Sequence, residues 1–263
     1  MKLIKKAKEW GNGAGVRVPR DWLGMEVEVK PLVPLGIEEI QREVLQRVNP
    51  YLANIQGVYL AGSYARGEQV NHSDIDILAI TDKPIKIPKK EPYDIYAISK
   101  DKLNKIIRYY PLQVMSMIQE AKPIINSALL EDLKKIELKP RYFKEHLEST
   151  KEALKIIENL IEGYEDSDLA QASLIYPLIL RLRGLYLVEA LLKNREYRNS
   201  HVKSDIEKLG ISMERVENIY KIYQIKRDIK KNLKHDITIG EAKKIYNMAL
   251  KKYGEIIKWL NEK

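Results

Sequence analysis

The sequence predicts an α/β (α+β) core with a small mixed sheet, preceded by a short β segment and followed by an all-α helical bundle. Residues 1–34 combine short alternating stretches with turn-forming glycines, which indicates β structure. Residues 35–128 combine helical spacing with short apolar strands, and residues 129–263 show helical spacing without a strand signal. A chain of 263 residues is long enough for this division into domains.

The N-terminal segment is predicted to form short strands joined by turns. Lys2–Lys8 and Met25–Lys30 alternate apolar and polar residues, which is the period of a strand with one buried face. Between them, Trp10–Gly13 has turn chemistry and Ala14–Val18 is apolar again. Pro31 marks the end of this alternation.

The central segment is predicted to mix helices and strands. Its apolar residues follow helical spacing at both ends and short continuous runs between them. The predicted elements are a helix at Ile37–Val48, strands at Gly57–Leu60, Asp74–Ile80 and Tyr93–Ser99, and a helix at Asp101–Tyr109. A loop rich in lysine and proline, Thr81–Pro92, joins the last two strands.

From Leu138 onward, the sequence predicts four or five amphipathic helices. The last helix begins at a capping box of the Ser/Thr-x-x-Glu type, formed by Thr238 and Glu241. The most apolar stretch, Leu174–Leu192, contains three charged residues, whereas a membrane span needs about 20 nearly uncharged ones. We therefore expect a buried helix there and no membrane association, and the N-terminus has no apolar signal core.

The composition favours a reducing compartment and phosphate-bearing partners. The chain contains no cysteine and therefore no disulfide or thiolate metal site, which fits the cytoplasm. Its formal net charge of +9 attracts phosphates over long range. Charged residues make up 32% of the chain, and many lysines and glutamates without cysteine are also typical of proteins from thermophiles. We interpret the charge mainly as heat adaptation and keep phosphate binding as the alternative.

Two carboxylates open the second predicted strand of the central segment. Successive side chains of a strand point to opposite faces, so Asp74 and Asp76 share one face. Like charges this close raise a pKa or recruit a cation, and oxygen ligands beside phosphates suit Mg²⁺. Two such ions can hold the attacking and leaving oxygens of a phosphoryl transfer. The pair therefore predicts a metal site for phosphate chemistry.

Further candidates lie on either side of this pair. Gly62 and Ser63 follow the first strand, where a glycine lets a phosphate approach the backbone and the hydroxyl can donate to it. Arg66 would add a fixed positive charge one turn later. Asp94 lies in the third strand, where a carboxylate is costly unless it is paired or metal-bound. If the second and third strands are neighbours, Asp94 completes a group of three carboxylates.

Two motifs of the central segment resemble the minimal nucleotidyltransferases of the polymerase-β superfamily, prokaryotic relatives of the kanamycin nucleotidyltransferases. The motifs are Gly62-Ser63-x-Ala65-Arg66-Gly67 and Ser73-Asp74-x-Asp76. This resemblance covers roughly residues 35–127. It implies Mg²⁺-dependent transfer of a nucleoside monophosphate from an NTP, usually ATP, with release of pyrophosphate.

The same resemblance implies a role for each site residue. Asp74 and Asp76 match the metal ligands of the family, and Asp94 matches its third carboxylate. Gly62 and Ser63 match its phosphate-binding pair. Arg66 and Ser73 belong to the same motifs, and we expect them to contribute to nucleotide binding. The acceptor hydroxyl can belong to a protein, a small molecule or RNA.

The N-terminal segment resembles the swapped-hairpin family of AbrB and MazE. The resemblance lies in a dozen residues, Lys8-Glu9-Trp10-Gly11-Asn12-Gly13-Ala14-Gly15-Val16-Arg17-Val18-Pro19. It implies a homodimeric β unit that often binds DNA. The segment ends at Pro31 without the final hairpin of that family, so we favour dimerisation or docking over DNA binding.

The C-terminal helices resemble HEPN domains, which commonly accompany minimal nucleotidyltransferases. Ribonuclease members of that family use an arginine and a histidine separated by four to six residues. Arg227 and His235 are separated by seven, and Arg195 and His201 have a permitted gap but precede the penultimate helix. The alternative is a bundle that covers the acceptor pocket.

Two further features of the sequence remain open. Lysines at 226, 230 and 234 form one basic helical stripe, which is either a binding surface or a solvated face. His72 precedes the carboxylates, but a single loop histidine is usually solvated.

Three hypotheses follow. The first is a nucleotidyltransferase, the second a toxin–antitoxin-type regulator that binds DNA through its N-terminal unit, and the third a HEPN-type ribonuclease controlled by its own nucleotidyltransferase domain. The complete pair of motifs around Gly62 and Asp76 favours the first.

Overall fold

The structure is a computed structural model that describes residues 3, 5–29, 35–70, 73–228 and 236–262. The chain divides into two compact units between Val33 and Pro34, and each is described by itself. Several sequence predictions lie outside the described residues. They concern His72, His235, and the basic stripe, of which only the backbone of Lys226 is described.

The first unit contains one hairpin. Strand β1 (Lys8–Trp10) pairs antiparallel with β2 (Gly13–Gly15) across a two-residue turn, and a short 3-10 helix, Arg20–Trp22, follows. The prediction of a strand over Met25–Lys30 is wrong for the described residues, because 25–29 form no strand. The apolar side chains of Met25, Val27 and Val29 are exposed. Alternation favours a strand only where a sheet buries one face of it, and these side chains are not buried.

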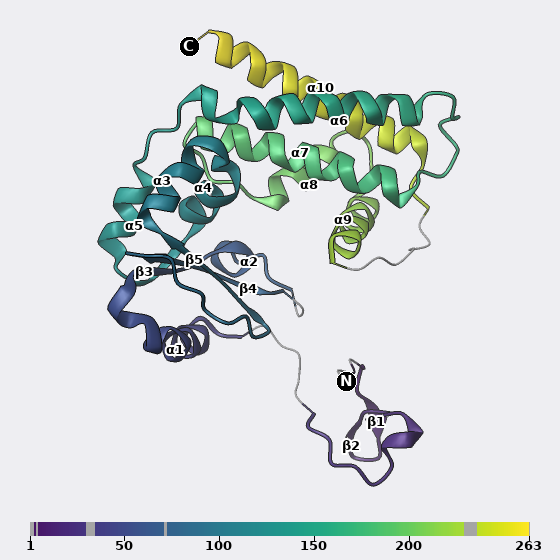
Figure 1. Cartoon of the computed structure of the whole chain (residues 1–263). Helices are drawn as coiled ribbons and strands as arrows, with labels where there is room; N and C mark the ends of the chain where they lie inside the picture. Colours follow the sequence, from purple (N-terminus) through teal and green to yellow (C-terminus); the bar gives the residue numbers. More distant parts are fainter. Residues whose placement is uncertain (1–2, 4, 30–34, 71–72, 229–235, 263) are drawn as a thin grey trace. The chain divides into compact units, whose positions relative to one another are not determined.

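The second unit is built on a four-stranded mixed sheet with the order β5-β4-β3-β6 (Figure 1). Strands β4 and β5 are parallel, and the other pairs are antiparallel. The strands are β3 (Ile55–Leu60), β4 (Ile75–Thr81), β5 (Tyr93–Ser99) and β6 (Lys122–Ile125). The first three lie within two residues of their predicted ends. Strand β6 was not predicted, since it is a short edge strand that contains a proline.

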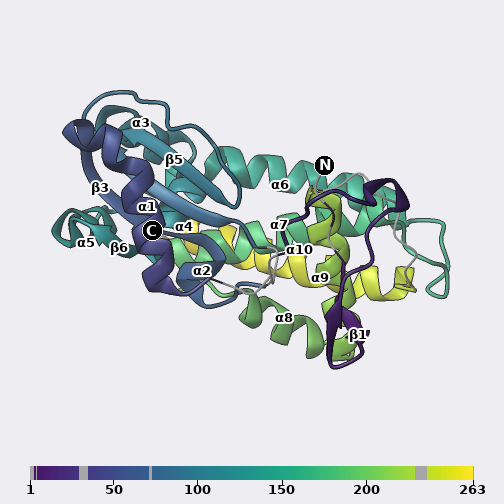
Figure 2. The same cartoon turned by 90° about the horizontal axis from the view of Figure 1, so that it is seen from below.

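Helices cover both faces of this sheet (Figures 1 and 2). Helix α1 (Ile37–Val48) packs against Ile75 and Ile77 of β4. The opposite face buries Leu78 and Ile80 of the same strand under three helices. These are α3 (Lys100–Tyr109), α4 (Pro111–Glu120) and α5 (Ser127–Lys134). Because side chains alternate along a strand, Asp76 lies on the same face as Leu78 and Ile80.

The remaining described residues include five helices, four of which pack around the buried central helix α7 (Figure 1). They are α6 (Lys144–Ile161), α7 (Ala172–Leu192), α8 (Asn199–Glu207), α9 (Met213–Asp228) and α10 (Ile239–Asn261). Helix α7 contacts α6, α9 and α10, so the apolar stretch is a core helix as predicted. Thr238 and Glu241 form the predicted capping box. No helix of the described chain is long and apolar enough to cross a membrane.

The α/β part and the helices belong to one compact unit that spans 34–263. The expected boundary between residues 128 and 129 falls inside α5, whose buried face packs with the sheet. Helix α4 contacts α7. The side chains of Leu138 and Leu191 pack both against the core between the sheet and α3–α5 and against the core around α7. The α/β and helical parts therefore share packed surface, which fixes the position of the helices relative to the sheet.

Candidate active site

Two predicted carboxylates lie side by side at one end of the sheet. Asp76 of β4 and Asp94 of β5 are direct partners in the parallel register, so both side chains leave the same face. Neighbouring strands are about 4.8 Å apart, which brings the two carboxylates close together. Asp74 is exposed and lies just before β4. The neighbouring strands and the shared face agree with the geometry that the sequence required for Asp94.

A lysine that the sequence analysis missed lies among these carboxylates. Lys89 belongs to the loop between β4 and β5, and its Nζ donates to Oδ2 of Asp94 at 2.8 Å. The hydrogen bond and charge of Asp94 raise the pKa of the Lys89 ammonium, and Asp74 and Asp76 raise it further. The ammonium therefore lies in the field of all three carboxylates. The only sequence signal was the lysine-rich composition of the loop.

The three carboxylates have the donor chemistry of a Mg²⁺ site, and one of them, Asp94, is paired with the Lys89 ammonium. Mg²⁺ takes hard oxygen ligands, often one or two carboxylates together with phosphates of a substrate. Across the described ranges of the chain, no group of three or more histidine, cysteine or carboxylate side chains is arranged to hold a metal ion by itself. Asp76 and Asp94, as register partners, and the nearby Asp74 fit Mg²⁺ by ligand type, with phosphates of a substrate as the further ligands that such a site requires.

The turn after β3 brings backbone against one of these carboxylates. The N–H of Ala61 donates to the backbone oxygen of Asp76 at 2.8 Å, and the short helix α2 (Gly62–Arg66) begins at the next residue. Gly62 has a φ of +66°, and a Cβ at this position would collide with the carboxylate of Asp76. Only glycine satisfies both conditions. Ser63 follows as a half-buried residue on α2.

Arg66 makes a different set of contacts from the phosphate contact that the sequence suggested. Its guanidinium pairs with Glu120 of α4 and, through Nε at 2.9 Å, with Glu68. The second oxygen of Glu120 accepts the N–H of Gly62 at 2.7 Å. The Arg66 side chain is only 12% exposed. Arg66 is thus engaged in fixing the turn, and a direct contact between Arg66 and a phosphate stays a prediction.

The electrostatics of this group follow from burial and pairing. Burial lowers the pKa of Arg66, but Glu120 and Glu68 outweigh it and raise that pKa above its usual value. Burial raises the pKa of the Glu120 carboxyl, and Arg66 opposes this shift. The Glu68 carboxyl has a lowered pKa because its hydrogen bonds outweigh its burial. Removing the arginine would leave two partly buried carboxylates without their cation.

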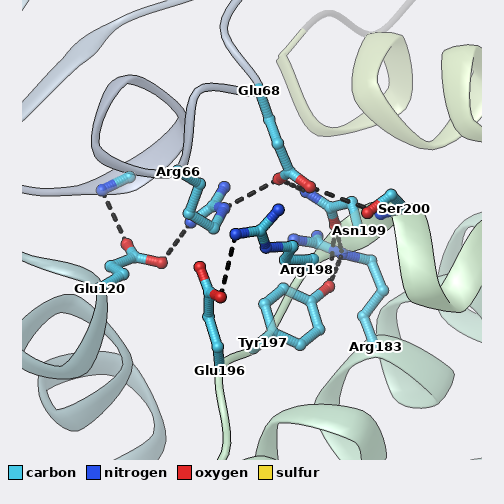
Figure 3. A network of polar contacts seen from close by, with 10 residues as sticks. Arg66, Glu68, Glu120, Arg183, Glu196, Tyr197, Arg198, Asn199 and Ser200 are labelled. Atoms are coloured by element: carbon cyan, nitrogen blue, oxygen red, sulfur yellow. Dashed lines mark hydrogen bonds and ion pairs between the residues drawn. The ribbon is translucent and has the colours of Figure 1, made fainter.

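The network continues into the helical part of the unit (Figure 3). Oε2 of Glu68 accepts from Nδ2 of Asn199 at 2.8 Å, and Oε1 accepts the N–H of Ser200 at 3.4 Å. Oδ1 of Asn199 in turn accepts from Nε of Arg183 on α7 at 3.0 Å. Arg183 also donates to the hydroxyl of Tyr197. The Gly-Ser turn is therefore connected to the start of α8 by side chains that no sequence spacing revealed.

The remaining sequence candidates lie in two other places. The Oγ of Ser73 accepts the N–H of Val70 at 2.9 Å, and Ser73 directly precedes Asp74. Arg195 and His201 line the same cavity of about 420 Å³ beside α7, α8 and α10, and none of the three aspartates lines it. The side chain of Arg227 lies outside the described residues.

Comparison with known families bears on this arrangement. Residues 37–165, just under half of the chain, match the sequence model of the nucleotidyltransferase domain. The chain carries a nucleotidyltransferase domain. The matched region begins at the first residue of α1 and includes Gly62, Asp76 and Asp94. The protein is therefore a nucleotidyltransferase enzyme.

The chain was also compared with solved structures and with curated protein sequences. Seven chains of solved structures match, among them spectinomycin adenyltransferase AAD(9) from Enterococcus faecialis, crystallised with ATP and spectinomycin. That chain is 15% identical, has a TM-score of 0.44, and is covered completely by 83% of this chain. No curated protein sequence matches this nucleotidyltransferase.

We predict that Gly62→Ala impairs this nucleotidyltransferase far more than Gly67→Ala. Both glycines have a positive φ, so each substitution costs about 1 kcal/mol of backbone strain. A Cβ at position 67 meets nothing within 4 Å, whereas one at position 62 displaces Asp76. A displacement of about 1 Å at reacting groups can lower the rate about 100-fold. Label transfer from ATP and thermal melting measure the two effects, and equal transfer by both variants contradicts the prediction.

We also predict that Arg66→Ala mainly destabilises the nucleotidyltransferase. Removing one partner of a buried ion pair typically costs about 3–5 kcal/mol, because the other charge stays buried. Arg198→Ala is the control, since its pair with Glu196 is half exposed and should contribute nothing measurable to melting. Denaturant melts of both variants test this. An Arg66→Ala protein that melts like the parent but binds ATP weakly would make Arg66 a phosphate ligand.

Proposed function

We propose that this nucleotidyltransferase transfers a nucleoside monophosphate from an NTP, with ATP as the preferred donor, to a hydroxyl acceptor. The acceptor oxygen forms a bond to the α-phosphorus, the bond to the bridging oxygen breaks, and pyrophosphate leaves. The observation that carries the proposal is the register pairing of Asp76 with Asp94, beside a turn where Gly62 has no room for a side chain.

The proposal assigns Mg²⁺ to the carboxylates Asp74, Asp76 and Asp94. Their oxygens are the ligand type that Mg²⁺ prefers beside phosphates. When bound, the ion supplies charge stabilisation at the phosphate oxygens and makes the acceptor hydroxyl easier to deprotonate.

The residues of the chain have separate tasks in this proposal. Gly62 admits the triphosphate close to Asp76, and the Ser63 hydroxyl donates to a phosphate oxygen. Asp94 accepts the proton of the acceptor hydroxyl, because it lies on the strand next to Asp76 and its side chain is 48% exposed. Ser73 contributes indirectly, through its hydrogen bond to the N–H of Val70 just before Asp74.

We predict that Asp94→Asn lowers transfer at least about 100-fold and changes nucleotide affinity much less. An amide cannot accept the proton, and the loss of a proton acceptor lowers turnover more than ground-state binding. The measurement uses labelled ATP with protein, RNA and small-molecule fractions of a cell extract, which also identifies the acceptor class. Asp101→Asn, an exposed residue at the start of α3, is the control.

Two outcomes would contradict the assignment. An Asp94→Asn variant that labels its acceptor at the parental rate removes the base role. Calorimetry with ATP and Mg²⁺ tests the metal ligands separately, and an Asp76→Asn variant with parental affinity removes the metal role. Together these experiments separate the proton-acceptor role of Asp94 from the metal-binding role of Asp76.

We further propose that residues 1–33 form a pairing unit with a second copy of the chain. Large apolar side chains of this unit are exposed, among them Trp10 at 77%, Leu23 at 89% and Met25 at 63%. A two-stranded hairpin alone is marginal in water, so these side chains need a partner to be buried. We therefore propose that residues 1–33 form the contact of a homodimer, with DNA binding by the same residues as the alternative.

We predict that the intact protein is a dimer and that a chain lacking residues 1–33 is a monomer. Light scattering measures both, and a gel shift with duplex DNA tests the alternative. Trp10→Ser in the full chain should weaken the dimer without deleting the segment, since that side chain is exposed on β1. An intact protein that stays monomeric at every measured concentration removes this proposal.

A further inference from the structure

The loop between β4 and β5 returns the chain to the edge of the sheet where the carboxylates lie. Because β4 and β5 are parallel, residues 82–92 must run from the end of one strand to the beginning of the other. Two backbone hydrogen bonds fix the end of this return. The N–H of Ile75 donates to the oxygen of Pro92 at 2.9 Å, and the N–H of Tyr93 donates to the oxygen of Lys90 at 3.0 Å. Lys89 is therefore held beside the start of both strands.

The side chain of Lys89 completes this placement. Its Nζ lies 2.8 Å from Oδ2 of Asp94, and Asp74 and Asp76 also act electrostatically on the same ammonium. Three carboxylates at one edge repel one another unless a cation lies among them. The ion pair between Lys89 and Asp94 places a positive charge beside this group.

The ion pair between Lys89 and Asp94 is exposed to solvent and therefore weak. The side chain of Lys89 is 63% exposed and that of Asp94 is 48% exposed, so water screens their attraction. Exposed pairs of this kind are weak and change an equilibrium by a factor of about five at most. A divalent cation carries twice the charge and binds oxygen directly, so it prevails over the ammonium when it is available.

From these contacts we infer that Lys89 is the resident counter-ion of Asp74, Asp76 and Asp94, and that a divalent cation must displace it. This inference rests on the proposed metal role of the three aspartates. The ammonium neutralises the group while no metal is bound, and it lowers the affinity for a free metal ion. Lys89 is thus a specificity-determining residue, since it favours metal that arrives together with a nucleotide over metal alone.

The test measures Mn²⁺ binding to the full chain without nucleotide, by the loss of the free Mn²⁺ signal in electron paramagnetic resonance. We expect Lys89→Gln to bind Mn²⁺ about two- to fivefold more tightly than the parent, as the strength of an exposed pair allows. Lys89→Arg, which keeps the charge, should bind like the parent. Lys86→Gln is the matched control, because it removes the same charge from an exposed position of the same loop.

Two outcomes overturn the inference. One is a Lys89→Gln variant that binds Mn²⁺ with the affinity of the parent. The other is a Lys86→Gln variant that tightens Mn²⁺ binding equally, which would show that only the general loss of charge matters. Failure of the proposed function gives a different result. If Asp76→Asn binds Mn²⁺ as well as the parent does, the aspartates are not the metal ligands, whatever Lys89 does.

Discussion

Gly62 lies so close to Asp76 that no side chain fits between them, and the other features of the site follow from this contact. The backbone of the turn can approach Asp76 only because β3 and β4 are paired to their ends, where Ala61 donates to the oxygen of Asp76. A phosphate bound at this turn would therefore lie beside the carboxylates without further movement. The parallel register then adds Asp94 to the same face. Strand pairing alone brings together groups that are far apart in sequence.

The ion pairs among Arg66, Glu68 and Glu120 stabilise the turn at Gly62. Charged side chains this little exposed are costly unless each finds a partner, and here each has at least one. Their arrangement fixes the N–H of Gly62 through Glu120 and reaches Asn199 through Glu68. The turn at Gly62 is thus connected by hydrogen bonds and ion pairs to α4 and to the start of α8. Such support is what keeps a reactive geometry within the tolerance that catalysis requires.

Local patterns predicted the parts of this structure that local physics determines. The strand that carries Asp76, the helix at Ile37–Val48 and the capping box at Thr238 depend on neighbours in sequence, and each was predicted. The partners of Arg66 were not predictable, because Glu120 lies 54 residues away and is placed by packing. The same holds for Lys89, which a loop of no regular structure carries to Asp94. The motif predicted a positive charge at Arg66. Its ion pairs with Glu68 and Glu120 depend on tertiary packing.

The connection between the two parallel strands also limits the design of the domain. Strand β4 has seven residues and is about 23 Å long, and residues 82–92 can span about 36 Å when fully extended. The loop is therefore only about four residues longer than the minimum needed to return along β4, and it contains no crossover helix. Insertions into this loop can bulge into solvent, but deletions soon tighten the chain across the sheet. The length of the loop is thus a mechanical constraint, and it keeps the residues that precede Tyr93 within reach of the carboxylates.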